Sequence, residues 1–76
     1  MNDTIAQAIE AKLDRAATEA RTADIATLIF TIESTTAAIT RISEAGHTND
    51  PLVAAELDMH FQIRLFARNA IIEKTK

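Results

Sequence analysis

The apolar residues of the first 45 positions recur at helical spacing, but on two different faces. At about 100° per residue, the second set is turned from the first by roughly half a revolution. A break near residues 22–24, capped by Thr22 or Asp24, would reconcile the two faces, and the alternative is one continuous helix that contacts two neighbours. We favour the break, with helices over about 3–22 and 24–45. The first face consists of Ile5, Ile9, Leu13, Ala16, Ala20 and Ala23, and the second of Ile25, Leu28, Ile29, Ile32, Ile39 and Ile42.

Residues 51–74 hold a third pattern that can be read in two ways. From Leu57 to Leu65 apolar and polar residues alternate, which is typical of a β-strand, but no second alternating run exists for it to pair with. Wound as a helix, the segment has two apolar stripes, and a helix of that kind must be covered on both sides. Leu57, Phe61, Leu65 and Ile72 form one stripe, and Leu52, Met59, Ile63, Phe66 and Ala70 form the other.

The only glycine and the only proline of the chain stand together in the turn at residues 46–50 and the residue after it. Gly46 suits the left-handed end of one helix, Asp50 can cap the next, and Pro51 suits its first position. The sequence therefore predicts a single all-α domain. We expect an antiparallel helical hairpin, 24–45 with 51–74, and an additional N-terminal helix, so that the chain has three helical segments and forms an oligomer.

The second stripe of the last helix is the reason to expect association. One stripe can face residues 25–42, and the other is exposed unless the first segment or another subunit covers it; contiguous exposed apolar patches usually mark association. Phe30 stands away from the stripe of its own helix and adds to that tendency. Our candidates for interface residues are Phe30, Met59, Phe61, Ile63, Phe66 and Ile72.

Charge and length narrow the class of partner. With 76 residues and a net charge of −3, the chain buries a small core and lacks the basic patch that nucleic-acid binding requires. There is no cysteine, and therefore neither a disulfide nor a thiolate zinc site. We expect the partner to be a second copy of the chain or another protein, and not a nucleic acid.

The residues that could carry catalysis are few. His47 and His60 are the only imidazoles, and Glu56 with His60 at i,i+4 supplies two metal ligands, which do not make a site. One glycine cannot build a phosphate-binding loop or a nucleophile elbow. We expect no enzymatic activity, no cofactor and no metal.

Membrane insertion is not expected either. The longest apolar runs, such as residues 28–30, are far shorter than the roughly 20 residues that cross a bilayer, and an acidic chain is repelled by anionic lipid. The N-terminal region has no basic start followed by an apolar stretch. The expected location is cytoplasmic, or exported without a cleavable signal peptide.

Residues 48–70 resemble one known family. The residues that carry the likeness are Asn49-Asp50-Pro51, Ala55-Glu56-Leu57, Gln62 and Arg68-Asn69-Ala70. They are similar to the turn and second helix of type III secretion needle subunits, in which two antiparallel helices meet at a short polar turn ending in proline. Asp58 stands where those subunits tend to carry glutamine. The three-segment layout also resembles the small chaperones that hold needle subunits.

Together these observations predict a non-enzymatic protein–protein interaction or assembly protein. The resemblance implies a needle-type subunit or its chaperone. The alternative is a small acidic helical inhibitor, of phage or plasmid type, that binds a host protein through the five acids before Ile25. Added salt should weaken such an inhibitor steeply and an apolar assembly much less.

Overall fold

The computed structural model describes residues 3–76 and contains three α-helices in this part of the chain. They are α1 (Asp3–Thr22), α2 (Ile25–Ala45) and α3 (Pro51–Lys74). No strand occurs among residues 3–76, and the alternating run from Leu57 to Leu65 lies inside α3. The prediction of an all-α fold is confirmed. The period-two pattern is explained by two apolar stripes on one helix, because a helix with apolar residues on two sides also produces local alternation.

The break between α1 and α2 falls at Ala23 and Asp24. Asp24 has an extended backbone and caps α2, and its carboxylate accepts a hydrogen bond of 2.8 Å from the backbone amide of Thr27. That bond satisfies one of the amides that have no partner at a helix start. The cap ends any continuity with α1, so the two apolar faces of the first 45 residues belong to two separate helices.

The turn between α2 and α3 is built from local chemistry. Gly46 adopts φ 79°, in the left-handed region, and its N–H donates to the carbonyl of Ser43 at 3.2 Å. Asp50 then caps α3 by accepting a bond of 2.9 Å from the amide of Leu52, and Pro51 occupies the first turn of α3. Each residue has the role that its backbone preferences favour.

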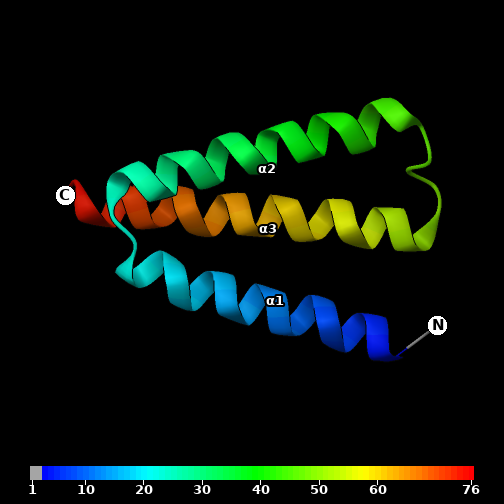
Figure 1. Ribbon diagram of the computed structural model, residues 1–76, viewed down its shortest axis with the longest axis horizontal. Helices are drawn as coiled ribbons and strands as arrows, with labels where there is room; N and C mark the ends of the chain where they lie inside the picture. Colours follow the sequence, from blue (N-terminus) through cyan, green and yellow to red (C-terminus); the bar gives the residue numbers. More distant parts are fainter. Residues whose placement is uncertain (1–2) are drawn as a thin grey trace.

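The three helices lie side by side with α3 in the middle (Figure 1). α2 and α3 run in opposite directions and pack along their length, and α1 packs on the other side of α3 but diverges from it toward the N-terminus. The molecule is flattened, with extents of 40 × 27 × 15 Å and a radius of gyration of 13.2 Å. A compact domain of this length has a radius of gyration of about 11.4 Å. The arrangement is therefore more open than that of a close-packed bundle.

The hydrophobic core is small and sits where α1 passes into α2. Leu28, 2% exposed, packs with two buried alanines, Ala20 of α1 and Ala67 of α3. Half-buried residues surround this cluster: Ala23, Ile32, Phe66, Ala70 and Ile71. Alanine lets helices approach closely but removes little apolar surface from water. Among residues 3–76, Leu28 is the only large side chain that is fully buried.

Candidate interaction surface

The two apolar stripes of α3 have different surroundings. Met59 is 6% exposed, and Ile63 and Phe66 are half-buried on the side of α3 that meets α1 and the core. The side of α3 that faces away from both α1 and α2 carries no neighbouring helix among residues 3–76. α1 therefore covers much of one stripe, and the second stripe is left without a partner in the single chain.

We call the uncovered side the outer stripe of α3. Its residues follow one another at alternating intervals of four and three, and all of them are exposed; they are Ala54, Asp58, Phe61, Leu65, Arg68 and Ile72. The large apolar members Phe61, Leu65 and Ile72 expose 43%, 47% and 48% of their surface. Spacing of this kind keeps residues on one face of a helix. The outer stripe is thus a continuous ridge of mixed apolar and charged side chains.

Arg64 fixes the edge of the outer stripe that adjoins α2. Its guanidinium donates to the hydroxyl of Thr36 at 3.2 Å, which ties α3 to α2. The same guanidinium lies over the ring of Phe61, 5.2 Å from its centroid. A cation over an aromatic face is attracted by the negative charge of that face. Phe61 is held toward α2 by this contact while much of its ring stays in solvent.

Two isoleucines of α2 extend the apolar surface beside the outer stripe. Ile29 and Ile25 stand seven and eleven residues before Thr36, and these intervals place all three on one face of a helix. Because Arg64 bonds Thr36 on that face, Ile25 and Ile29 lie on the side of α2 that adjoins the outer stripe. Their exposures are 39% and 47%. The candidate surface therefore spans two helices.

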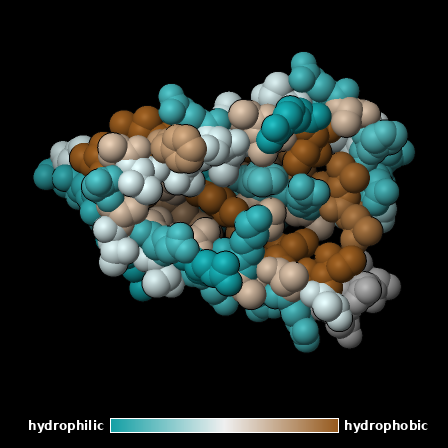
Figure 2. All heavy atoms as spheres, in the orientation of Figure 1, coloured by the Kyte–Doolittle hydropathy of each residue, from teal (hydrophilic) through white to brown (hydrophobic). Residues whose placement is uncertain are grey.

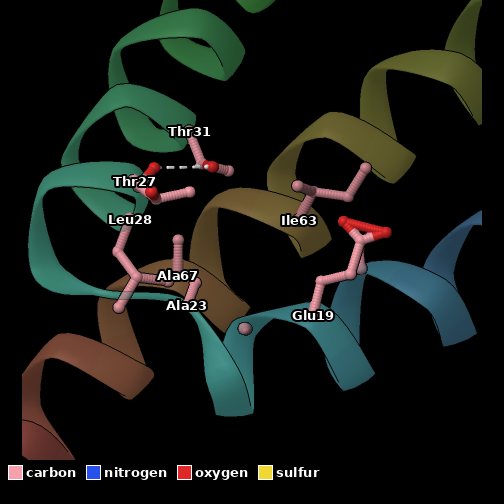
Figure 3. Close-up of a pocket in the computed structure, with 9 residues that line it drawn as sticks. Glu19, Ala23, Thr27, Leu28, Thr31, Ile63 and Ala67 are labelled. Atoms are coloured by element: carbon pink, nitrogen blue, oxygen red, sulfur yellow. Dashed lines mark hydrogen bonds between the residues drawn. The ribbon is translucent and has the colours of Figure 1, made fainter.

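The opposite face of the molecule is hollowed between α1 and α2. Figure 2 views the molecule from the direction of Figure 1, and hydrophobic side chains reach the surface at several places around this hollow. The hollow is floored by Ile63 and Ala67 of α3, with Glu19 on the α1 side and Thr27 and Thr31 on the α2 side (Figure 3).

Three threonine hydroxyls of α2 donate to carbonyls of their own helix. Thr31 donates to the carbonyl of Thr27 at 3.0 Å, and Thr35 donates to the carbonyl of Thr31 at 2.8 Å. Thr40 bonds the carbonyl of Thr36 in the same way, at 3.0 Å. Back-bonding of this kind uses the hydroxyl that a ligand would need. Of the two threonines that line the hollow, Thr31 is engaged in this way; most of the other lining residues are apolar, and Glu19 places one carboxylate at the rim.

The histidines do not assemble a chemical site. The imidazole Nε2 of His60 lies 3.9 Å from the carboxylate of Glu56, and its Nδ1 is buried and makes no hydrogen bond. His47 lies in the turn after Gly46. Within residues 3–76, no three His, Asp or Glu side chains come close enough together to bind a metal ion.

The residues that we predicted as interface candidates divide into two groups. Phe61 and Ile72 lie on the outer stripe, and Phe30, 68% exposed, lies on α2. Met59, Ile63 and Phe66 lie inside the chain, on the side that meets α1 and the core. Leu65, Ile25 and Ile29 were not among the candidates. Their signal in the sequence is spacing: Leu65 stands four residues after Phe61, and Ile25 and Ile29 stand four apart.

Among the described residues, α2 is the one helix long and apolar enough to cross a membrane by length and composition alone. The core helix of a soluble protein and a signal sequence pass the same test. We expected no such segment from the short apolar runs. The difference arises because Glu33 and Arg41 are the only charged residues between Ile25 and Ile42, so the whole helix is more apolar than any run within it.

No protein-family model, no curated protein and no solved structure matches this chain. The likeness of residues 48–70 to needle subunits stays a prediction.

Proposed function

We propose that this chain is a non-enzymatic protein–protein interaction or assembly protein that binds through the outer stripe of α3. The observation that supports the proposal is the exposure of Phe61, Leu65 and Ile72 on one ridge, beside Ile25 and Ile29 of α2. Full burial of a wholly exposed side chain of this size stabilises a complex by about 1.5–3 kcal/mol, and because these side chains expose less than half of their surface, each contributes roughly half of that. A soluble protein that leaves so many of them in water has a strong reason to associate.

Within this class, we propose a needle-type subunit of a type III secretion system or its chaperone. The support is local: Asp50 and Pro51 begin α3 after a short polar turn, and α2 and α3 run antiparallel. A helical hairpin that uses one side of its second helix internally and the other between copies fits both roles. A needle subunit would use the outer stripe on its neighbours, and a chaperone would use it on its client.

The acidic-inhibitor alternative finds less support in the charges of α1. Glu10 and Asp14 are exposed together with Lys12 and Arg15, which carry the opposite charge. A surface of mixed sign does not create the strong negative field that steers an inhibitor toward a basic target. The apolar outer stripe is the more distinctive surface of the molecule.

Assembly in water is also favoured over insertion of α2 into a membrane. Each large apolar residue at the centre of a span contributes about 0.3–0.6 kcal/mol, and one charged residue there costs about 2.5–3.5 kcal/mol. Glu33 stands near the middle of α2, and its cost offsets most of what the large apolar residues of that helix contribute. The serines and threonines of α2 add no compensating gain.

The test of this proposed function is site-specific photocrosslinking of the full chain in the cells that make it. A photoreactive amino acid replaces Leu65 on the outer stripe, and a matched variant carries it at Glu10 on the exposed side of α1. We expect discrete protein adducts from position 65 and none of comparable yield from position 10. The proposal fails if position 65 yields no adduct, or yields only the same adducts as position 10.

A further inference from the structure

The outer stripe has the spacing of a coiled-coil seam. Its intervals of four and three repeat from Ala54 to Ile72 without interruption, so its members occupy the two core positions of successive heptads. In a coiled coil, those positions face an equivalent row on a second helix. No helix of this chain fills that place within the described residues, because α1 and α2 pack on the other sides of α3.

The order of residues in the outer stripe is symmetric about the level of Ile63. Members of each pair stand at the same distance from Ile63 on either side: nine residues for Ala54 and Ile72, five for Asp58 and Arg68, and two for Phe61 and Leu65. If a second copy is placed antiparallel, with a two-fold axis at this level, each residue meets its counterpart. A small side chain then meets a large one, an acid meets a base, and an aromatic ring meets a leucine.

The charged pair discriminates between the possible arrangements. Asp58 and Arg68 make no ion pair or side-chain hydrogen bond among residues 3–76. A parallel pairing in register would place Asp58 against Asp58 and Arg68 against Arg68, which repel. The antiparallel pairing instead places Asp58 of each copy opposite Arg68 of the other copy. The interface then holds two pairs of opposite charge. Like charges at an interface exclude the wrong register as effectively as matched charges favour the right one.

The single chain exposes more surface than a typical folded monomer of its mass, by about the area that one partner would cover. A folded monomer of 8.3 kDa exposes about 4,600 Å², whereas this chain exposes 5361 Å². The excess is roughly 800 Å², and each partner of a standard interface buries about the same area. One helix seam of this length, with Ile25 and Ile29 at its side, is a suitable source for that area.

We infer that the outer stripe of α3 is the seam of a two-fold symmetric homodimer, whose occupant is the same stripe of a second copy running antiparallel. This inference rests on the broader proposed function, an interaction protein that binds through the outer stripe, and it specifies the partner; a stripe closed in a homodimer is not free for the neighbours of a needle subunit or for the client of a chaperone. The central layers are Phe61 against Leu65 of the second copy, repeated by symmetry. The layers of Asp58 and Arg68 flank them, and those of Ala54 and Ile72 close the ends. Such an interface is closed and does not extend into a filament.

The test is sedimentation of the purified full-length chain with a set of charge reversals. We expect the wild-type chain to sediment as a dimer that dissociates on dilution. Asp58→Arg alone and Arg68→Asp alone each create two like-charge contacts, and each should raise the dimer dissociation constant about tenfold to a hundredfold. The double variant D58R/R68D restores both pairs in reversed order and should return the constant to within a few-fold of wild type.

The control is Glu10→Arg, which makes the same change of charge as Asp58→Arg on the exposed surface of α1 and should leave the dissociation constant unchanged. All positions altered are exposed, and circular dichroism at equal concentration verifies that helicity is kept. The inference is overturned if the single reversals leave the dimer dissociation constant unchanged. It is also overturned if the double variant does not return that constant to within a few-fold of wild type. Species that grow beyond a dimer with concentration also overturn it and favour an open assembly.

A purified wild-type chain that stays monomeric at about 1 mM, a concentration at which even weak interfaces associate, would likewise overturn the homodimer. The proposed function is tested separately. If the chain is monomeric but position 65 still crosslinks to a different protein in cells, the outer stripe binds that protein. The homodimer is then wrong, and the proposed function stands.

Discussion

Phe61 and Phe66 stand five residues apart in α3 and face different environments. Five residues turn a helix by about 500°, or 140° beyond a full revolution. Phe66 packs half-buried against the core cluster of Leu28, Ala20 and Ala67, whereas Phe61 lies on the outer stripe with 43% of its surface exposed. Of these two identical side chains on one helix, Phe66 is therefore part of the packed interior and Phe61 is part of the exposed surface.

The first prediction distinguishes an effect on folding, expected for Phe66, from an effect on association, expected for Phe61. Phe66→Ala should lower the free energy of unfolding by about 2–3 kcal/mol, just below the usual range for a buried phenylalanine because the ring is only half-buried. Phe61→Ala should leave helicity intact at low concentration and weaken association. Urea titration by circular dichroism measures the first effect, and sedimentation measures the second. Equal loss of helicity in both variants would contradict this division.

The second prediction concerns Leu28, the one large side chain that is fully buried among residues 3–76. Leu28→Ala removes the largest buried side chain of the cluster with Ala20 and Ala67 and should cost about 2.7–5 kcal/mol. A domain of this length has a total stability of about 4–11 kcal/mol, so the variant should be unfolded or nearly so. Ile29→Ala is the matched control, because Ile29 is the next residue and is 47% exposed. Its transition should shift by much less, and similar shifts would place the core elsewhere.

The third prediction concerns the pH dependence contributed by Asp24. Hydrogen bonds from the side chain and the backbone amide of Thr27, aided by the charge of Lys74 and opposed in part by desolvation, hold the pKa of Asp24 below its ordinary value. The unfolded chain therefore takes up this proton at a higher pH than the folded chain. The contribution to stability is present above about pH 3.9, the ordinary value for aspartate, and is lost as the pH falls through the lowered pKa.

Asp24→Asn isolates this effect, because asparagine keeps the capping oxygen and removes the charge. At neutral pH the wild-type chain should melt at a higher temperature than the variant, and the gap should close as the pH falls below that of an ordinary aspartate. Thermal melts followed by circular dichroism from pH 7 to pH 2.5 measure it. A gap that stays constant across this range would show that the charge of Asp24 contributes nothing.

The fourth prediction tests the left-handed turn residue. No atom lies within 4 Å of a Cβ added to Gly46, so a substitution there meets no steric obstacle, but its φ of +79° is unfavourable for residues with a side chain. Gly46→Ala should cost roughly 1–2 kcal/mol. Gly46→Asn should cost less, because asparagine tolerates this conformation better. Equal stability of all three chains in urea would contradict the assigned backbone conformation.

The fifth prediction concerns α1. Removal of residues 1–21 deletes Ala20 from the core and uncovers Ile63 and Phe66, which lie beside α1. The shortened chain should lose its cooperative thermal transition, because α2 and α3 alone bury too little apolar surface for a chain of that size. A control that lacks residues 1–8 keeps Ala20 and should retain the transition. A sharp transition in the shorter chain would show that the α2–α3 pair folds alone.

The caps and the turn could be predicted from the sequence because their causes are local. Asp24 and Asp50 accept hydrogen bonds from the amides of Thr27 and Leu52, only a few residues away. Gly46 and Pro51 act through the angles of their own backbone. The two stripes of α3 were also visible in the sequence. Which of them faces α1 was not, since that depends on where α1 lies. The stripe of α1 declines to alanine after Leu13, so its hydrophobicity gives a weak signal. Ala20 contributes through its small size, which lets α1 approach α3 closely.

The sequence predicted that the last helix has an uncovered apolar side, but not which of its residues lie there. Hydrophobicity alone ranks Met59 and Phe66 together with Phe61, because burial is a tertiary property that no residue carries by itself. Once Met59 and Phe66 are assigned to the inner side of α3, the remaining exposed residues of that helix reveal the interval of four and three. The positions of Asp58 and Arg68, which are unremarkable as isolated surface charges, then become informative.

The alanines at the centre of the core, Ala20 and Ala67, have a consequence for abundance. A copy on its own keeps little free energy in reserve. In the homodimer inferred above, docking of a second copy would add to that free energy in proportion to the logarithm of the chain concentration. Scarce chains would then spend more time unfolded, where proteases reach them, and the amount synthesised would set how long the chain persists.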